Sequence, residues 1–285
     1  MTMSDVEELA AVSRAIGRNP AYVQGGGGNT SLKTGDRVMH IKASGIGLAS
    51  VTAGEGFVAL DWRALRQSLD ACETEADYAH ALRGARLDPA ETRRASIETG
   101  MHALLGPCVL HSHSVWANLL TCADGGEQLA HRLLPDAVWV PYATPGLPLT
   151  RQVASLLRDR PDPSLLLLEN HGLVVTGPDV ASAAALHDKV NLHLRTHFGL
   201  DAAAYPGTAG AEIAEDRLLF PDQAIYLADP ALARSVAAQE TRQAFRFLLA
   251  TMPGLGLVPR FLGDAEFTEL VGLDAEKYRR KVAQS

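Results

Sequence analysis

Two histidines that lie one residue apart, His111 and His113 in "LHSHS", offer the clearest chemistry in this sequence. They follow the apolar run "CVL", which is typical of a buried strand. Side chains at i and i+2 of a strand point to the same face, so both imidazoles are expected to project together from the strand end. Imidazole nitrogens suit zinc and similar divalent ions.

A third ligand is expected, because a catalytic zinc usually takes three protein ligands and keeps one position open. His171 in "LLLLENHGLVV" also ends an apolar run, before a glycine. Two strands that end side by side would place all three imidazoles around one ion. The alternative is that they are ordinary strand-end histidines. A further pair, His193 and His197, has helical spacing but lacks the HExxH glutamate, which favours a solvated helix face.

A metal that polarises a carbonyl also needs a proton carrier. Glu98 in "ASIETGMHALL" lies on a predicted helix directly before the HxH strand. Folding back over the metal would bury this carboxyl and raise its pKa toward neutrality, as general acid–base catalysis requires. The alternative is a surface glutamate on an amphipathic helix.

The glycine stretch "GGGGNTS" at 25–31 has backbone amides that can approach an anion closely. The neighbouring polar residues in this stretch and in "IKASG" are Asn29, Thr30, Ser31, Lys42, Ser44 and Gly45. Together they predict a phosphate or carboxylate pocket, and the alternative is a plain loop. The stretch is not a Walker motif, because no GK[ST] ends it.

Bulk composition favours a globular protein of reducing surroundings. The 285 residues are 47% hydrophobic and 21% charged, and the formal net charge of −7 gives no basic footprint for nucleic acid. Cys72, Cys108 and Cys122 form no CxxC pair, which favours the cytoplasm. No signal peptide or membrane span is expected.

Hydrophobic periodicity predicts alternating helices and strands. Helices are expected at 5–17, 90–105, 150–159, 178–198 and 229–251, and strands at 38–42, 56–62, 108–113, 164–177 (with a turn) and 224–228. The region 201–214 reads as a linker. The alternation indicates a layered α/β or α+β fold, without separating parallel from antiparallel strands.

The order of these motifs, GGGNTS, KASG, E-x-x-x-H, HSH and NHG, resembles the class II aldolase/adducin family over roughly residues 8–230. The forms "GRNPAYVQGGGGNTSLK" and "VPYATPGLPLT" look most like its rhamnulose-1-phosphate-aldolase-like branch. That branch includes the aldolase part of fusions with a short-chain dehydrogenase. The resemblance implies an α/β fold, with three α/β/α layers around a mainly antiparallel sheet. It also implies a homo-oligomer, with a tetramer favoured.

The resemblance assigns roles to the residues that match the family motifs. It implies His111, His113 and His171 as zinc ligands, Glu98 as catalytic acid/base, and Asn29, Ser31, Lys42, Ser44, Gly45 and Ser96 as substrate-binding residues. It also marks a departure, because Ile97 stands where related aldolases carry a second phosphate-binding serine. We expect residues 1–230 to form the catalytic domain and 231–285 a helical extension packed on it.

The function implied is a zinc-dependent aldolase, with another divalent transition metal as an alternative cofactor. It would cleave a small ketose phosphate, or a related hydroxy-ketone, by a retro-aldol reaction through a metal-bound enediolate. Rival functions on the same site are a sugar-phosphate epimerase, a decarboxylase and a dehydratase. A rival of another class is a non-catalytic adducin-like binding module, which the intact histidine set disfavours.

Overall fold

The computed structural model describes residues 4–206, 217–274 and 277–278, and its described part contains a seven-stranded sheet. The strands are β1 (Asn29–Thr34), β2 (Val38–Lys42), β3 (Phe57–Asp61), β4 (Cys108–Ser112), β5 (Val138–Val140), β6 (Leu165–Leu168) and β7 (Gly172–Gly177). Their spatial order is β3-β2-β1-β4-β7-β6-β5. Only the β5–β6 pair is parallel, so the expected α/β fold with a mainly antiparallel sheet is confirmed.

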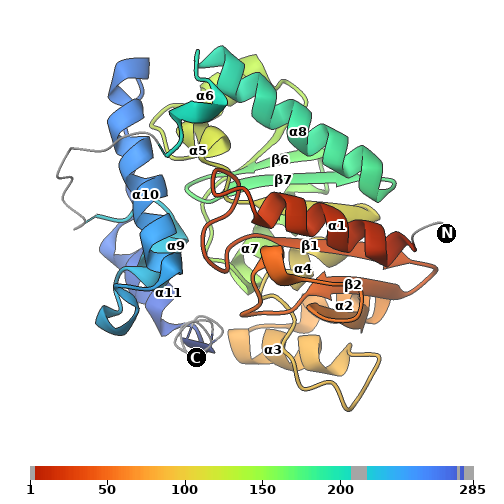
Figure 1. Ribbon diagram of the computed structural model, residues 1–285. Coiled ribbons are helices and arrows are strands. Elements are labelled where there is room, and N and C mark those ends of the chain that lie inside the picture. The colour runs from red at the N-terminus through yellow and green to blue at the C-terminus, as the bar shows by residue number, and fades with distance from the viewer. Residues whose placement is uncertain (1–3, 207–216, 275–276, 279–285) are drawn as a thin grey trace.

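Helices cover both faces of this sheet (Figure 1). On one face lie α1 (Asp5–Gly17), α5 (Val115–Thr121), α6 (Gly126–Leu133) and α8 (Val180–His197), and on the other α2 (Trp62–Ser68), α3 (Glu75–Gly84), α4 (Thr99–Leu104) and α7 (Leu147–Leu156). Successive strand residues enter opposite layers: Leu110 packs toward α5, and Val109 toward α4 and α7. Burial on both faces explains why "CVL" and "LLLL" are continuous apolar runs.

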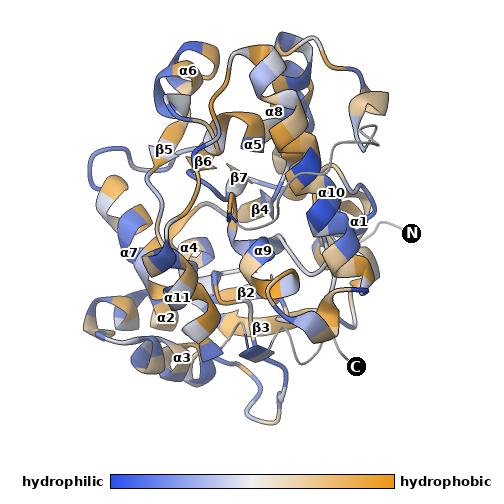
Figure 2. Cartoon of the chain, turned by 90° about the vertical axis from the view of Figure 1, so that its left-hand side faces the viewer, coloured by the Kyte–Doolittle hydropathy of each residue, from blue (hydrophilic) through white to orange (hydrophobic). Residues whose placement is uncertain are grey.

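A third group of helices follows residue 217. It consists of α9 (Pro221–Tyr226), α10 (Val236–Thr251) and α11 (Asp264–Gly272). Helix α9 contacts both α10 and α11, and α10 also contacts α5. Figure 2 views the molecule from the side of α9, where this helix lies in front of the sheet. The division at residue 230 stays a prediction, and the expected linker at 201–214 lies partly outside the described residues.

Three local expectations are wrong. No strand was predicted at β1, because "NTSLKT" has one strongly apolar residue, and this segment becomes a strand by pairing with β2 and β4. The segment 224–228 was expected as a strand, but 221–226 form α9, whose Gln223 side chain accepts from the Leu219 and Phe220 amides. A helix was expected over residues 90–105, but only Thr99–Leu104 are helical, as α4.

Residues 90–98 instead run beside the segment that follows β2. Ala95 forms a β-bridge with Ala43, and the Ser44 amide donates to the Arg94 carbonyl at 2.7 Å. Glu98 therefore precedes α4 as its N-cap residue rather than lying within a helix. None of the helices in the described ranges is long and apolar enough to cross a membrane.

Candidate metal centre

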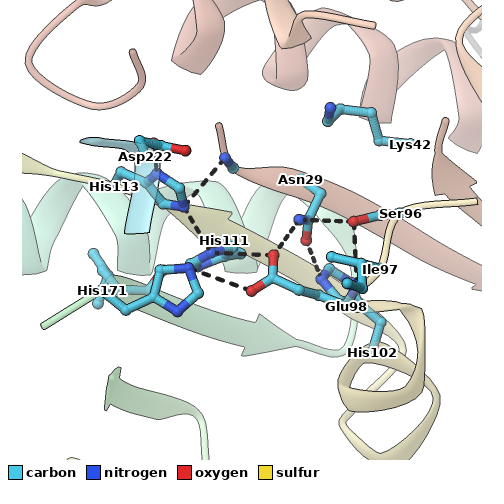
Figure 3. Close-up of polar contacts among 12 residues, drawn as sticks. Asn29, Lys42, Ser96, Ile97, Glu98, His102, His111, His113, His171 and Asp222 are labelled. Atoms are coloured by element: carbon cyan, nitrogen blue, oxygen red, sulfur yellow. Dashed lines mark hydrogen bonds and ion pairs between the residues drawn. The ribbon is translucent and has the colours of Figure 1, made fainter. Parts of the chain in front are cut away.

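The three histidines meet where β4 ends and β7 begins. In the antiparallel β4–β7 pair, His111 lies opposite Val174 and Ser112 opposite Leu173, so the turn before β7 adjoins the end of β4. His113 directly follows β4, and His171 directly precedes β7. One ring nitrogen of each histidine lies within 4.8 Å of the others, and all three side chains are buried (Figure 3).

Hydrogen bonds on the far side of two of these rings decide which nitrogens face the centre. The His111 Nδ1 donates to the Leu173 carbonyl at 3.0 Å, and the His113 Nδ1 donates to the Asp222 carboxylate. Each neutral ring then carries its lone pair on Nε2. The two Nε2 atoms face each other at 3.2 Å, where lone pairs repel unless a cation lies between them.

His171 completes a ligand set that fits a divalent metal ion. Its Nδ1 is buried without a hydrogen-bond partner, and its Nε2 faces Glu98. Burial lowers the pKa of His171 to about 3, and it also lowers the pKa of His111. Neutral imidazoles are the form that binds metal. The structure thus brings together three imidazole side chains, a donor set that suits zinc among other ions.

The turn that carries His171 needs the residues on either side of it. Asn170 has φ of 51°, in the left-handed region that asparagine tolerates better than most residues. Its side-chain nitrogen donates to the Leu219 and Arg260 carbonyls at 2.8 and 2.6 Å. A Cβ at Gly172 would lie 2.4 Å from the Ser112 carbonyl oxygen. Each letter of "NHG" therefore has a separate structural reason.

Glu98 lies against the histidines, as the sequence predicts. One carboxylate oxygen is 3.4 Å from the His111 Nε2, and the other is 3.4 Å from the His171 Nε2. Burial acts to raise the pKa of Glu98, but the three histidines and the Asn29 amide outweigh it and hold the pKa at about 2. The expected rise toward neutrality is therefore wrong for this arrangement, and the carboxylate is ionised at neutral pH.

A buried chain of hydrogen bonds fixes the orientation of Glu98. The Ser31 hydroxyl bonds the His102 Nδ1 at 2.7 Å, and the His102 Nε2 bonds the Asn29 side-chain oxygen. The Asn29 Nδ2 then donates to Glu98 at 2.6 Å. One direction of donation, from serine to carboxylate, satisfies every member with a neutral His102. Burial lowers the pKa of this imidazole to about 3, in keeping with that assignment.

A pocket opens above these groups. It is lined by Gly26, Gly27, Gly28, Asn29, Lys42, Ser44, Gly45, Ser96, Ile97, Glu98, His113, Pro145, His171, Pro221 and Asp222. Five of the six residues expected to bind substrate are on this lining. Ser31 is not, because its hydroxyl lies behind Asn29 at the start of the chain of hydrogen bonds. Ile97 adds an apolar side chain beside Ser96.

The glycine amides do not form the expected anion cradle. Gly25 donates to Glu240 at 2.7 Å and Gly26 to the Tyr226 hydroxyl at 3.0 Å. Gly27 donates to the Gln24 carbonyl at 3.0 Å, and Gly28 faces the His113 Nε2 at 3.4 Å. The glycines instead allow close approach: a Cβ at Gly27 would lie 2.7 Å from the His113 Nδ1.

Lys42 is a buried residue of the pocket lining. Its ammonium group donates to the Ile46 carbonyl at 2.6 Å and lies 3.4 Å from the Gly26 carbonyl. The side chain therefore joins two loops that line the pocket, and its positive charge is part of the same lining as Ser44 and Asn29. Both features are compatible with an anionic end of the substrate at this point.

Two residues at the site were not anticipated from the sequence. Asp222 bonds a histidine 109 positions earlier, and "FPDQ" carries no pattern that points to a metal centre. Tyr226 accepts a hydrogen bond from the Gly26 amide of the glycine stretch. No local signal identifies either, because both depend on where α9 packs.

Known proteins agree with this architecture. Residues 7–196 match the family model "Class II Aldolase and Adducin N-terminal domain", and the chain belongs to this family. The expected family resemblance is confirmed.

Individual proteins of known sequence or structure also resemble this chain. An "Uncharacterized oxidoreductase YuxG" of Bacillus subtilis is 36% identical over 185 residues, which are 60% of this chain and 26% of that protein. The chain thus matches about a quarter of this relative's length. The N-terminal class II aldolase domain of a conserved protein from Thermoplasma acidophilum has a TM-score of 0.62 and 27% identity, covering 69% of this chain and 95% of that one. A sugar-phosphate aldolase from Thermotoga maritima has a TM-score of 0.50 and 12% identity, covering 72% and 97%.

Proposed function

We propose that this protein is a divalent-metal-dependent aldolase that cleaves a ketose phosphate, or a related hydroxy-ketone, between two carbons. The observation that carries the proposal is the pair of Nε2 lone pairs 3.2 Å apart, with His171 and an ionised Glu98 beside them. Membership of the class II aldolase and adducin family supports a lyase. Zinc is the proposed metal, because three imidazoles with an open position are typical of catalytic zinc.

The residues around the histidines would divide the work of the reaction. A divalent ion held by His111, His113 and His171 would supply Lewis-acid polarisation of the substrate carbonyl. In the synthetic direction, Glu98 would remove a proton from the carbon of the nucleophilic fragment. In cleavage, a base would take the hydroxyl proton of the aldehyde-forming fragment as the carbon–carbon bond breaks, and Glu98, once protonated, would give a proton to the carbon of the nucleophilic fragment. Its low pKa keeps it ionised at neutral pH, so it has a free lone pair that can accept a proton, and Asn29 keeps its oxygens directed at the histidines.

The pocket would also bind the charged end of the substrate. Ser44, Gly45 and Ser96 line it, and the Lys42 ammonium adds a positive charge. We infer an anionic group there, with phosphate as the first choice. Ile97 reduces the number of donors at this end, so an unphosphorylated hydroxy-ketone or a carboxylate is the variant of the proposal to test beside it.

Product analysis tests this function. Zinc-loaded protein would be incubated with a panel of ketose 1-phosphates and the matching free ketoses, and released aldehyde would be measured. The His171→Ala variant serves as the control that lacks one ligand. Aldehyde release by the wild-type protein alone supports the aldolase. Conversion of the panel to an epimer, or loss of carbon dioxide or water, would replace it by one of the rival reactions. Absence of both bound metal and turnover would favour a binding module.

Assembly is a separate part of the proposal. We expect a homo-oligomer, with a tetramer favoured, as related aldolases form. Light scattering coupled to size-exclusion chromatography on the metal-loaded protein measures the mass in solution. A monomer of 30.4 kDa at working concentration would contradict this expectation.

A further inference from the structure

The segment that follows the family domain reaches into the metal centre through one carboxylate. Asp222 lies on α9, beyond the matched residues 7–196, and its side chain is fully buried. It accepts a hydrogen bond from the Nδ1 of His113 (Figure 3). A buried carboxylate on the far nitrogen of a ligating imidazole fixes the ring and its tautomer and makes the other nitrogen a better donor.

Two further contacts show that α9 is held at this place from several sides. The Tyr226 hydroxyl accepts from the Gly26 amide at 3.0 Å, one helical turn after Asp222. The Leu219 carbonyl, just before α9, accepts from the Asn170 side chain at 2.8 Å. Asn170 precedes His171, so this segment touches the residues that orient two of the three histidines.

The glycine stretch packs closely against the contact between His113 and Asp222. A Cβ built on Gly27 would lie 2.7 Å from the His113 Nδ1 and 2.8 Å from an oxygen of Asp222. Gly27 has no positive φ, so a side chain there is excluded by this contact rather than by backbone strain. The backbone at Gly27 therefore packs closely against the pair, and a side chain there would push against both the imidazole and the carboxylate.

We propose that Asp222 is a positioning residue of the metal centre, so that the segment after the family domain contributes directly to metal affinity. The inference rests on the proposed function in one respect, namely that the histidines bind a divalent ion. It adds that His113 is a competent ligand only while Asp222 accepts its Nδ1 proton. Substitutions at Asp222 and at Gly27 should therefore both lower the affinity of the protein for the metal ion.

Metal affinity, rather than turnover, is the measurement. Zinc affinity would be determined by competition with a chromophoric chelator for wild-type, Asp222→Ala, Asp222→Asn and Gly27→Ala proteins. Loss of a hydrogen-bond partner of a ligand typically costs about 10–100-fold in affinity, which is expected for Asp222→Ala. Asparagine keeps an oxygen that can accept from Nδ1, so Asp222→Asn should lie between alanine and the wild type. Gly27→Ala should fall in the same range as Asp222→Ala.

Asp188→Asn is the matched control. Asp188 also lies beside a histidine, His187, at 3.7 Å, but it is 76% exposed and outside the centre. Its substitution should leave zinc affinity unchanged. Cobalt-loaded proteins add a spectroscopic readout, because the absorption of Co²⁺ changes with ligand geometry and should shift in both Asp222 variants. Circular dichroism in chelator checks that each variant is folded, and Asp222→Asn preserves the side-chain volume if alanine does not fold.

The outcomes separate this inference from the proposed function. A wild-type protein that binds zinc, with folded Asp222→Ala and Gly27→Ala variants within twofold of its affinity, would overturn the positioning role and leave the aldolase intact. A wild-type protein that binds no divalent metal would overturn both. A graded loss, largest for alanine and absent for Asp188→Asn, supports the inference.

Discussion

The Glu98 carboxylate bridges two imidazoles, with one oxygen 3.4 Å from the Nε2 of His111 and the other 3.4 Å from the Nε2 of His171. This position places a carboxylate directly beside two of the three proposed metal ligands. It also places a negative charge beside the Nε2 of His111, whose Nδ1 proton is held by the Leu173 carbonyl. A bound cation would relieve the repulsion between the His111 and His113 lone pairs and would balance the charge of Glu98, which is the physical basis of the predictions on metal content and proton transfer.

The first prediction concerns metal content. Protein purified without chelator should carry about one divalent ion per chain, most of it zinc. His111→Ala, His113→Ala and His171→Ala should each remove most of it, because two imidazoles hold zinc much less tightly than three. His131, exposed on α6, gives the control His131→Ala. Elemental analysis decides, and full metal in any of the three ligand variants would remove that histidine from the set.

The second prediction concerns proton transfer. Glu98→Gln keeps the size of the side chain but cannot accept a proton, so kcat should fall by about 10²–10⁴-fold. The metal should stay, because the three histidines still hold it. The exposed Glu127 on α6 provides the control Glu127→Gln. Turnover and bound zinc would be measured on the same preparation, and near-wild-type turnover with full metal would mean that another group moves the proton.

The third prediction separates two residues at the anion end of the pocket. Ser44→Ala removes one pocket hydroxyl and should raise KM for an anionic substrate, by about 10-fold for a lost bond to a charged group, without changing stability. Lys42→Ala should raise KM as well, but it also frees the Ile46 and Gly26 carbonyls. It should therefore lower the free energy of unfolding by about 1–3 kcal/mol.

The exposed Lys189 on α8 supplies the control for this comparison. Lys189→Ala removes a positive charge outside the pocket and should change neither KM nor stability. Steady-state kinetics and denaturant unfolding on the three variants give the answer. An unchanged KM for Lys42→Ala with the best substrate would show that the lysine only joins the two loops.

The fourth prediction concerns pH and the metal-free protein. Burial lowers the pKa of His102 from its ordinary 6.5 to about 3, so the unfolded chain takes up a proton below about 6.5 that the folded protein refuses. Stability should fall with acidification, by about 1.4 kcal/mol per pH unit for such a histidine. Glu98, lowered from 4.5 to about 2, loses its contribution only below 4.5. The window from pH 6.5 to 4.5 therefore isolates the histidines.

His102→Gln tests the share of this one residue. Glutamine can still donate toward Asn29 but does not titrate in this range. Denaturant unfolding in the presence of chelator, at pH 6.5 and 4.5, should show a smaller stability loss for the variant than for the wild type. Equal losses in both proteins would mean that His102 is protonated in the folded state, contrary to the hydrogen-bond chain from Ser31 to Glu98.

The sequence by itself determined the parts of this protein that depend on neighbours along the chain. Strand alternation put His111 and His113 on one side of β4, and the apolar run before "NHG" placed His171 at a second strand end. Continuous apolar runs such as "LLLL" indicated strands buried on both faces. These patterns report local backbone geometry, which a short window of residues is sufficient to specify.

Packing between distant segments decided the rest. The strand β1, with one strongly apolar residue, exists because β2 and β4 supply its hydrogen bonds. Ser31 faces His102 rather than the pocket, and the low pKa of Glu98 arises because three histidines from two strand ends outweigh its burial. Asp222 reaches His113 across 109 positions because α9 packs over the strand ends. Such contacts depend on the packing of the whole core, so they cannot be predicted from a short stretch of sequence.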